Sequence, residues 1–99
     1  MMVSFDPRKN KINIEERGLS FSMAENFDWS SSFIIEDVRE NYGERRFQAL
    51  GFIDDLLYMV VFTPRNGLVH VISFRRANQR ERKKYESQVK SKIKFQVES

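Results

Sequence analysis

Closely spaced β-forming segments constrain the fold of this chain more than any other feature. Residues 46–53, 56–63 and 68–74 are rich in β-branched and aromatic side chains, and a similar segment begins at Phe33. Asp54-Asp55 and the Asn66-Gly67 turn separate the last three segments, and a turn near Gly43 precedes them. Because parallel neighbours need a crossover of about a dozen residues, these short connections predict a four-stranded antiparallel sheet.

Helix signals flank the predicted sheet on both sides. Asp6-Pro7 is a typical helix start, and Gly18 is a suitable C-cap for a helix that ends near residue 16. Ser22 and Glu25 have capping-box spacing, which predicts a second, short helix over residues 22–27. Residues 78 to about 90 predict a basic helix. The expected fold is therefore α+β: two N-terminal helices, a four-stranded antiparallel sheet and a C-terminal basic helix, in one domain over residues 1–90.

The tail over residues 91–99 has a different pattern. From Lys92 to Val97 polar and apolar residues alternate strictly, which favours a strand over a helix. A single strand is not stable alone, so we expect the tail either to add an edge strand to a sheet, its own or a partner's, or to be disordered.

The charge of the chain is unevenly distributed. The net charge of the 99 residues is +3, but residues 75–94 contain nine Lys or Arg and two acidic residues, which gives this segment +7. Such asymmetry indicates a cationic surface for an anionic partner, although a charge run taken alone is more commonly a solvated helix face. The lack of cysteine favours a reducing, cytoplasmic compartment, and we find neither a signal peptide nor a membrane-spanning segment.

Familiar catalytic and cofactor motifs are absent from the sequence. It has one His, no Cys, no phosphate-binding glycine loop and no dinucleotide fingerprint, so we expect no cofactor and no metal. The adjacent carboxylates Glu36-Asp37 would point to opposite faces of a strand and would not converge. What remains is arginine near strand ends, which suits phosphodiester cleavage because RNA carries its own nucleophile, the 2′-hydroxyl.

Two features near the end of the last strand bear on this chemistry. Strict alternation places the residues of that strand on two faces: Leu68, His70, Ile72 and Phe74 on one, and Val69, Val71, Ser73 and Arg75 on the other. His70 among apolar residues is either a partly buried structural histidine or a proton carrier. Arg75 and Arg76 point opposite ways, so at least one should reach an open face.

Five ordered segments resemble the BrnT-type toxins over about residues 5–85. These segments are Phe5-Asp6-Pro7-x-Lys9-x-x-x-Asn13, Gly18-Leu19-Ser20-Phe21 with Ala24 and Phe27, Gly43-Glu44-x-Arg46-Phe47-x-Ala49-Leu50-Gly51, Val60-Val61-Phe62-Thr63, and Ile72-Ser73-Phe74-Arg75-Arg76-Ala77 followed by Glu81 and Tyr85. The resemblance implies a RelE-like α+β fold and a ribonuclease toxin that needs no metal. It also implies a ribbon-helix-helix antitoxin that blocks the toxin, forms a heterotetramer with it and binds operator DNA.

The resulting hypothesis is an endoribonuclease that cleaves mRNA by 2′-hydroxyl attack and leaves a cyclic phosphate. The alternative is a non-catalytic module of the same fold that binds nucleic acid or poisons a protein target, as ParE-like relatives do. The expected catalytic residues are Arg46, His70, Arg75, Arg76 and Tyr85, and the expected RNA-binding residues are Arg65, Arg80, Arg82, Lys83 and Lys84. Lys9 and Asn13 are weaker candidates, because such residues in a first helix commonly serve as surface or capping groups.

Overall fold

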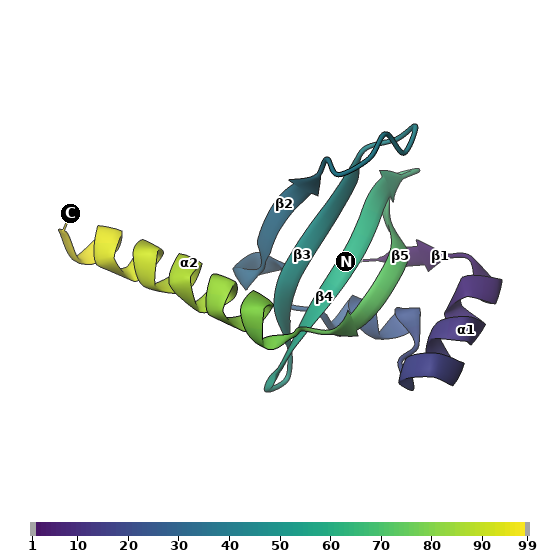
Figure 1. The fold of residues 1–99 in the computed structure, drawn as a ribbon, viewed down its shortest axis with the longest axis horizontal. Coiled ribbons are helices and arrows are strands. Elements are labelled where there is room, and N and C mark those ends of the chain that lie inside the picture. The colour runs from purple at the N-terminus through teal and green to yellow at the C-terminus, as the bar shows by residue number, and fades with distance from the viewer. Residues whose placement is uncertain (1, 99) are drawn as a thin grey trace.

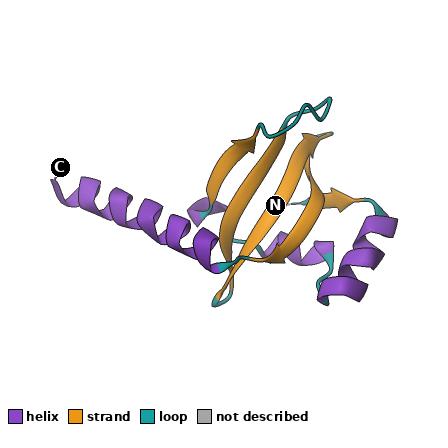
Figure 2. Cartoon of the chain, viewed as in Figure 1, coloured by secondary structure: helices purple, strands orange, loops and turns teal. Residues whose placement is uncertain are grey.

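A single five-stranded sheet organises the chain (Figures 1 and 2). The computed structural model describes the backbone of residues 2–98 and the side chains of residues 2–89. The elements in chain order are β1 (Val3–Phe5), α1 (Pro7–Arg17), the 3₁₀ helices η1 (Phe21–Asn26) and η2 (Trp29–Ser31), β2 (Phe33–Asp37), β3 (Arg46–Ile53), β4 (Leu56–Arg65), β5 (Leu68–Arg76) and α2 (Gln79–Glu98).

The sheet has the strand order β1-β5-β4-β3-β2 and is mixed. Strands β2 to β5 form the antiparallel meander that the sequence predicts, but β1 pairs with β5 in parallel. The prediction of a four-stranded antiparallel sheet is therefore wrong. Val3–Phe5 is too short to show an alternation, and its partner β5 lies more than sixty residues later, so the whole meander serves as the crossover that a parallel pair requires.

The N-terminal helices form largely where capping residues predict them. The Asp6 carboxylate accepts a hydrogen bond from the Arg8 N–H at 2.9 Å, and Gly18 ends α1 with a left-handed φ of 70°. The second helix is a 3₁₀ helix, capped by Ser20 rather than Ser22. At the start of α2, Asn78, which precedes the helix, and Glu81 in its first turn form a reciprocal capping box.

Helix α2 continues to Glu98 and includes the whole segment, Lys92 to Val97, whose alternation favoured an edge strand. The docking of this segment onto a partner stays a prediction, and the side chains of residues 90–99 lie outside the part that the structure describes.

The two faces of the sheet differ in what covers them. One face packs against η1 and η2 around Phe21, Phe27, Val60 and Phe74, and we call it the helix-covered face. On the other face, Tyr85 of α2 packs on Leu50, Leu57 and Met59 at one end of the sheet. We call this second face the open face, since α2 crosses only that end and then extends away from the sheet (Figure 1).

A β-bulge in β5 determines which side chains reach the open face. Val61 pairs with Ser73, but the next residue, Phe62, pairs with Val71, so Ile72 is an extra residue. Val69, Val71 and Phe74 consequently all enter the helix-covered core. The strict alternation predicted from the sequence is thus wrong for this strand: Phe74 and His70 lie on opposite faces.

Candidate functional site

A polar groove of about 330 Å³ crosses the open face, and we call it the arginine groove. Its floor is the row formed by Gln48, Val61 and Ser73, which are paired across β3, β4 and β5. Arg46 enters at one end of this floor, where β3 begins, and Arg75 enters at the other, where β5 ends. Both arginines were expected from the sequence, and the sheet brings them to the two ends of one groove.

Arg46 is held in place by an aromatic ring and keeps free donor capacity. Its guanidinium carbon lies 4.0 Å from the centre of the Tyr42 ring, a cation–π stack. Its Nε is buried without a hydrogen-bond partner among the described residues, and the Glu44 carboxylate is 3.9 Å away. A buried charged donor without a partner is costly, so this end of the groove favours an anion.

A buried carboxylate fixes the same end of the groove. The Asp37 side chain is 1% exposed, and Arg39 donates two hydrogen bonds to it, each 2.8 Å long. The Tyr42 hydroxyl donates a third, at 3.2 Å. The bonds from Arg39 hold the pKa of Asp37 well below its usual range, so the carboxylate is ionised at neutral pH. Tyr42 thereby links Asp37 to the stack under Arg46.

The other end of the groove depends on Glu81. Arg75 donates two hydrogen bonds to the Glu81 carboxylate, both 2.8 Å long, and Glu81 also accepts from the backbone N–H of Asn78 in the capping box. These bonds from Arg75 lower the pKa of Glu81, and the Glu81 carboxylate raises the pKa of Arg75. The start of α2 therefore orients Arg75 within the groove.

The other three predicted catalytic residues are not among those that line the arginine groove. Arg76 points to the helix-covered face and lies 5.7 Å from the Tyr58 ring. His70 pairs in register with Thr63 at the side of the sheet near β1, and its Nδ1 is 2.9 Å from the Ser4 hydroxyl. Tyr85 is buried, and its hydroxyl donates a 2.9 Å hydrogen bond to the Ser31 carbonyl.

Two of the five predicted RNA-binding residues lie together over the open face, and the other three lie apart from them. Arg80 and Lys84 are one helical turn apart and lie over the open face beside Phe33 and Leu50. The remaining three lie elsewhere: Arg82 contacts the hollow around Phe52 and Val89, Lys83 is exposed on α2, and Arg65 is paired with Glu44 at 3.0 Å.

The weaker candidate Asn13 has structural contacts. It is buried and donates hydrogen bonds to the carbonyls of Leu19 and Phe74, at 2.9 and 3.0 Å, which fastens α1 to β5. Lys9 lies on the same helix and lines a separate hollow that shares Ile72 with the arginine groove.

Sequence reasoning missed Asp37, Arg39, Tyr42, Gln48 and Glu81 as groove residues. The prediction that Glu36 and Asp37 do not converge is confirmed, since Glu36 binds Arg45 and Asp37 binds Arg39. The alternation Phe33, Ile35, Asp37 was an available signal, because it puts Asp37 on the same face as the apolar residues of β2. The loop between β2 and β3, which brings Arg39 and Tyr42 back to Asp37, has no comparable pattern.

A substitution at Tyr85 tests whether its hydroxyl has a structural role or a role in proton transfer. Tyr85→Phe keeps the ring contact with Phe52 and removes only the hydrogen bond to Ser31, so we expect a loss of about 0.5–1.5 kcal/mol in the free energy of unfolding. The RNA cleavage expected from the sequence should keep its wild-type kcat at a temperature where both proteins are folded. A large fall in kcat without a fall in stability would instead assign the hydroxyl to proton transfer.

A groove lined by several arginines on a small α+β domain is the kind of surface that binds a polyanion. The family described as the ribonuclease toxin BrnT of type II toxin–antitoxin systems matches residues 5–81, and the chain belongs to this family. It is thus a ribonuclease toxin, with RNA as substrate and an antitoxin protein as partner. A search among curated proteins gave no match.

The described residues contain neither a membrane-spanning helix nor a cluster of metal-binding side chains. No helix there is long and apolar enough to cross a membrane. No group of three or more His, Cys, Asp or Glu side chains in that part of the chain is arranged to hold a metal ion.

Proposed function

We propose that the arginine groove cleaves RNA by attack of a 2′-hydroxyl on the adjacent phosphate, with arginine rather than a metal ion stabilising the transition state. The observation that carries this proposal is the placement of Arg46 and Arg75 at the two ends of one groove. Within the part of the chain that the structure describes, the buried Nε of Arg46 has no hydrogen-bond partner. A phosphate between them would accept hydrogen bonds from both guanidinium groups as negative charge grows on its oxygens.

The reaction needs little covalent chemistry from the protein. The 2′-oxygen forms a bond to phosphorus, the bond from phosphorus to the 5′-oxygen breaks, and the products are a 2′,3′-cyclic phosphate and a 5′-hydroxyl end. The groove would align these three atoms, and its arginines would bind the pentacoordinate phosphorane more strongly than the ground-state phosphate. His70 does not line the groove, but it lies on the same open face, where it pairs with Thr63, two residues along β4 from Val61 of the groove floor. It is therefore the candidate for proton transfer, whereas the Tyr85 hydroxyl is bonded to the Ser31 carbonyl.

An RNA oligonucleotide with a single 2′-deoxy residue tests the proposal. We expect the purified protein to cleave the all-ribose oligonucleotide at a defined bond and to leave that bond intact when the nucleotide on its 5′ side is 2′-deoxy. A deoxy residue one position further along serves as the control and should not protect the bond. Cleavage at the same bond in both modified oligonucleotides would rule out 2′-hydroxyl attack.

The role of His70 predicts a specific pH dependence. Partial burial, followed by the nearby Arg65 charge, lowers the pKa of His70 below its ordinary value of 6.5. If neutral His70 accepts the proton, kcat/KM should fall as the pH drops through this lowered pKa, with the midpoint below 6.5. In His70→Gln that step should disappear and the rate at neutral pH should decrease. An unchanged pH profile would show that His70 has only a structural role, the hydrogen bond to Ser4 of β1.

The same shift in pKa has a consequence for stability. The unfolded chain binds a proton at His70 more readily than the folded chain does, so the stability that neutral His70 provides is present above pH 6.5 and is lost as the pH falls from there toward the lowered pKa. The difference in free energy of unfolding between wild type and His70→Gln should change in that window.

The proposed partner is the antitoxin that the family resemblance implies. A ribbon-helix-helix antitoxin would cover the arginine groove, assemble with the toxin as a heterotetramer and bind operator DNA itself. The support for occlusion is the excess of arginine over carboxylate in the groove, together with the cations Arg80 and Lys84 on the first turns of α2. A cytoplasmic location remains an expectation from the lack of cysteine.

A further inference from the structure

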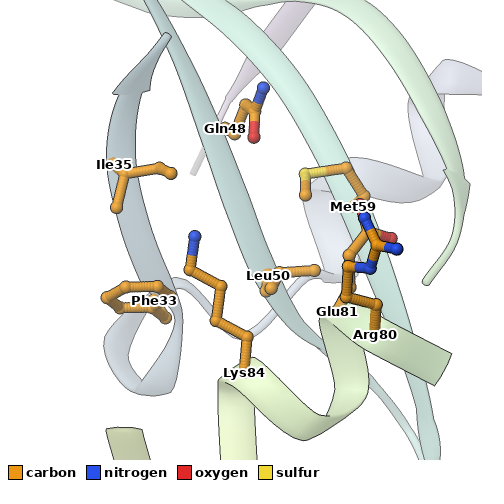
Figure 3. Close-up of a pocket in the computed structure, with 8 residues that line it drawn as sticks. All are labelled: Phe33, Ile35, Gln48, Leu50, Met59, Arg80, Glu81 and Lys84. Atoms are coloured by element: carbon orange, nitrogen blue, oxygen red, sulfur yellow. The ribbon is translucent and has the colours of Figure 1, made fainter. Parts of the chain in front are cut away.

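A second hollow opens beside the arginine groove on the same face of the sheet. Figure 3 shows the residues that line this hollow. It has a volume of about 200 Å³, and its walls are Phe33 and Ile35 of β2, Leu50 of β3 and Met59 of β4. Arg80 and Lys84 reach over it from α2 (Figure 3). Gln48, Met59 and Glu81 line both spaces, so the hollow and the arginine groove are direct neighbours.

The hollow combines an apolar interior with a cationic rim. The Lys84 amine lies 5.7 Å from the centre of the Phe33 ring, and Arg80 is exposed at the same rim. At the boundary with the groove stands Gln48, whose amide can both donate and accept hydrogen bonds. The volume is below the roughly 300–1,000 Å³ of pockets that hold drug-sized ligands, so it suits a smaller group.

We infer that this hollow is a subsite for one unstacked nucleobase of a single-stranded RNA whose neighbouring phosphate occupies the arginine groove. The inference rests on the proposed function. A nucleobase is flat, presents apolar faces to Phe33 and Ile35, and carries polar edge groups for Gln48. Its attached phosphates would lie between the rim cations and the arginines of the groove.

The subsite also defines the class of substrate. Bases in an RNA duplex are stacked and paired, and the deep major groove of such a duplex hides their edges from side chains. A base can enter the hollow only after it leaves a stack, which is easiest in single strands, loops and bulges. The protein should therefore bind and cleave single-stranded RNA in preference to a perfect duplex of the same sequence.

Binding of an uncleavable oligonucleotide tests the subsite separately from catalysis. The probe is a short, fluorescently labelled 2′-O-methyl RNA, compared by anisotropy with an abasic version that keeps every sugar and phosphate. We expect the wild-type protein to bind the base-bearing probe at least about tenfold more tightly, because base–aromatic contacts contribute substantially to such binding. Equal affinities for the two probes would overturn the inference.

Two tryptophan variants of β2 provide the matched comparison. Ile35→Trp should fill the hollow without changing charge and reduce the affinity ratio to about one, since the abasic probe needs only the groove. Ile34→Trp, at a position 44% exposed on the opposite side of the same strand, should keep the wild-type ratio. A third variant, Phe33→Leu, keeps an apolar wall and should lower the ratio because the aromatic ring is lost.

The outcomes separate the subsite from the proposed function. If Ile35→Trp keeps the base preference while Arg75→Ala abolishes cleavage, the subsite is wrong and the groove chemistry stands. If the base preference depends on Ile35 but 2′-deoxy RNA is still cleaved, the subsite stands and the 2′-hydroxyl mechanism fails. If Ile35→Trp weakens binding of the antitoxin and leaves the base preference unchanged, the hollow receives a protein side chain and the inference is overturned.

Discussion

Arg75→Ala is expected to lower the rate of RNA cleavage by a factor of about 100 to 1,000, the usual cost of removing one preorganised donor to a developing negative charge. Arg76→Ala, one residue further along, should change the rate by less than about threefold, because its side chain lies over Tyr58 on the helix-covered face. Single-turnover cleavage of a labelled oligonucleotide measures both rates.

A loss of activity in Arg75→Ala must be distinguished from a loss of folding, because removing Arg75 leaves Glu81 without its partner. Thermal unfolding of each variant should therefore be measured before its activity. Arg75→Lys keeps the charge and should retain more activity than Arg75→Ala, although a lysine cannot reproduce the two parallel hydrogen bonds. Equal losses in Arg75→Ala and Arg76→Ala, with both proteins folded, would contradict the assignment of Arg75 to the groove.

Gly51→Ala should destabilise the fold by about 1–3 kcal/mol, although alanine is the smallest possible addition. Gly51 lies within β3, and a Cβ at this position would come within 2.5 Å of the Phe27 ring. Phe27 is buried and packs edge-on against Trp29, whose ring in turn contacts Phe62. The ring therefore cannot move aside without disturbing the core, and denaturant unfolding should show the loss directly.

A double-mutant cycle identifies the cause of that loss. In a Phe27→Leu background the ring is absent, so the additional cost of Gly51→Ala should fall by at least about 0.5 kcal/mol. If the two substitutions are additive, contact with Phe27 is not the reason for the glycine.

The sequence predicted the elements whose signals are local. Asp6-Pro7 and Gly18 bound α1, and the β-forming segments with their short turns correspond to β2 to β5. The sequence did not predict elements whose structure depends on pairing or packing with distant residues. The three residues of β1 become a strand only because β5 is there to accept them, and their pairing makes the sheet mixed.

The candidate site shows the same division. Arg46 and Arg75 could be selected as arginines at strand ends, but the bulge at Ile72 is what separates His70 from the face that Phe74 occupies. The stack of Arg46 on Tyr42 and the bonds of Arg39 and Tyr42 to Asp37 depend on the path of one irregular loop. An irregular loop has no repeating pattern of apolar residues, so its path cannot be predicted from the sequence in this way.

The chemical nature of the product ends tests the central claim most directly. Purified protein should be incubated with an oligoribonucleotide in the presence of excess chelator, and the fragments should be analysed by mass spectrometry. The account predicts cleavage at an undiminished rate, with a 2′,3′-cyclic phosphate on the upstream fragment and a 5′-hydroxyl on the downstream one. Loss of cleavage in chelator, or fragments with 3′-hydroxyl and 5′-phosphate ends, would contradict cleavage by 2′-hydroxyl attack in the arginine groove.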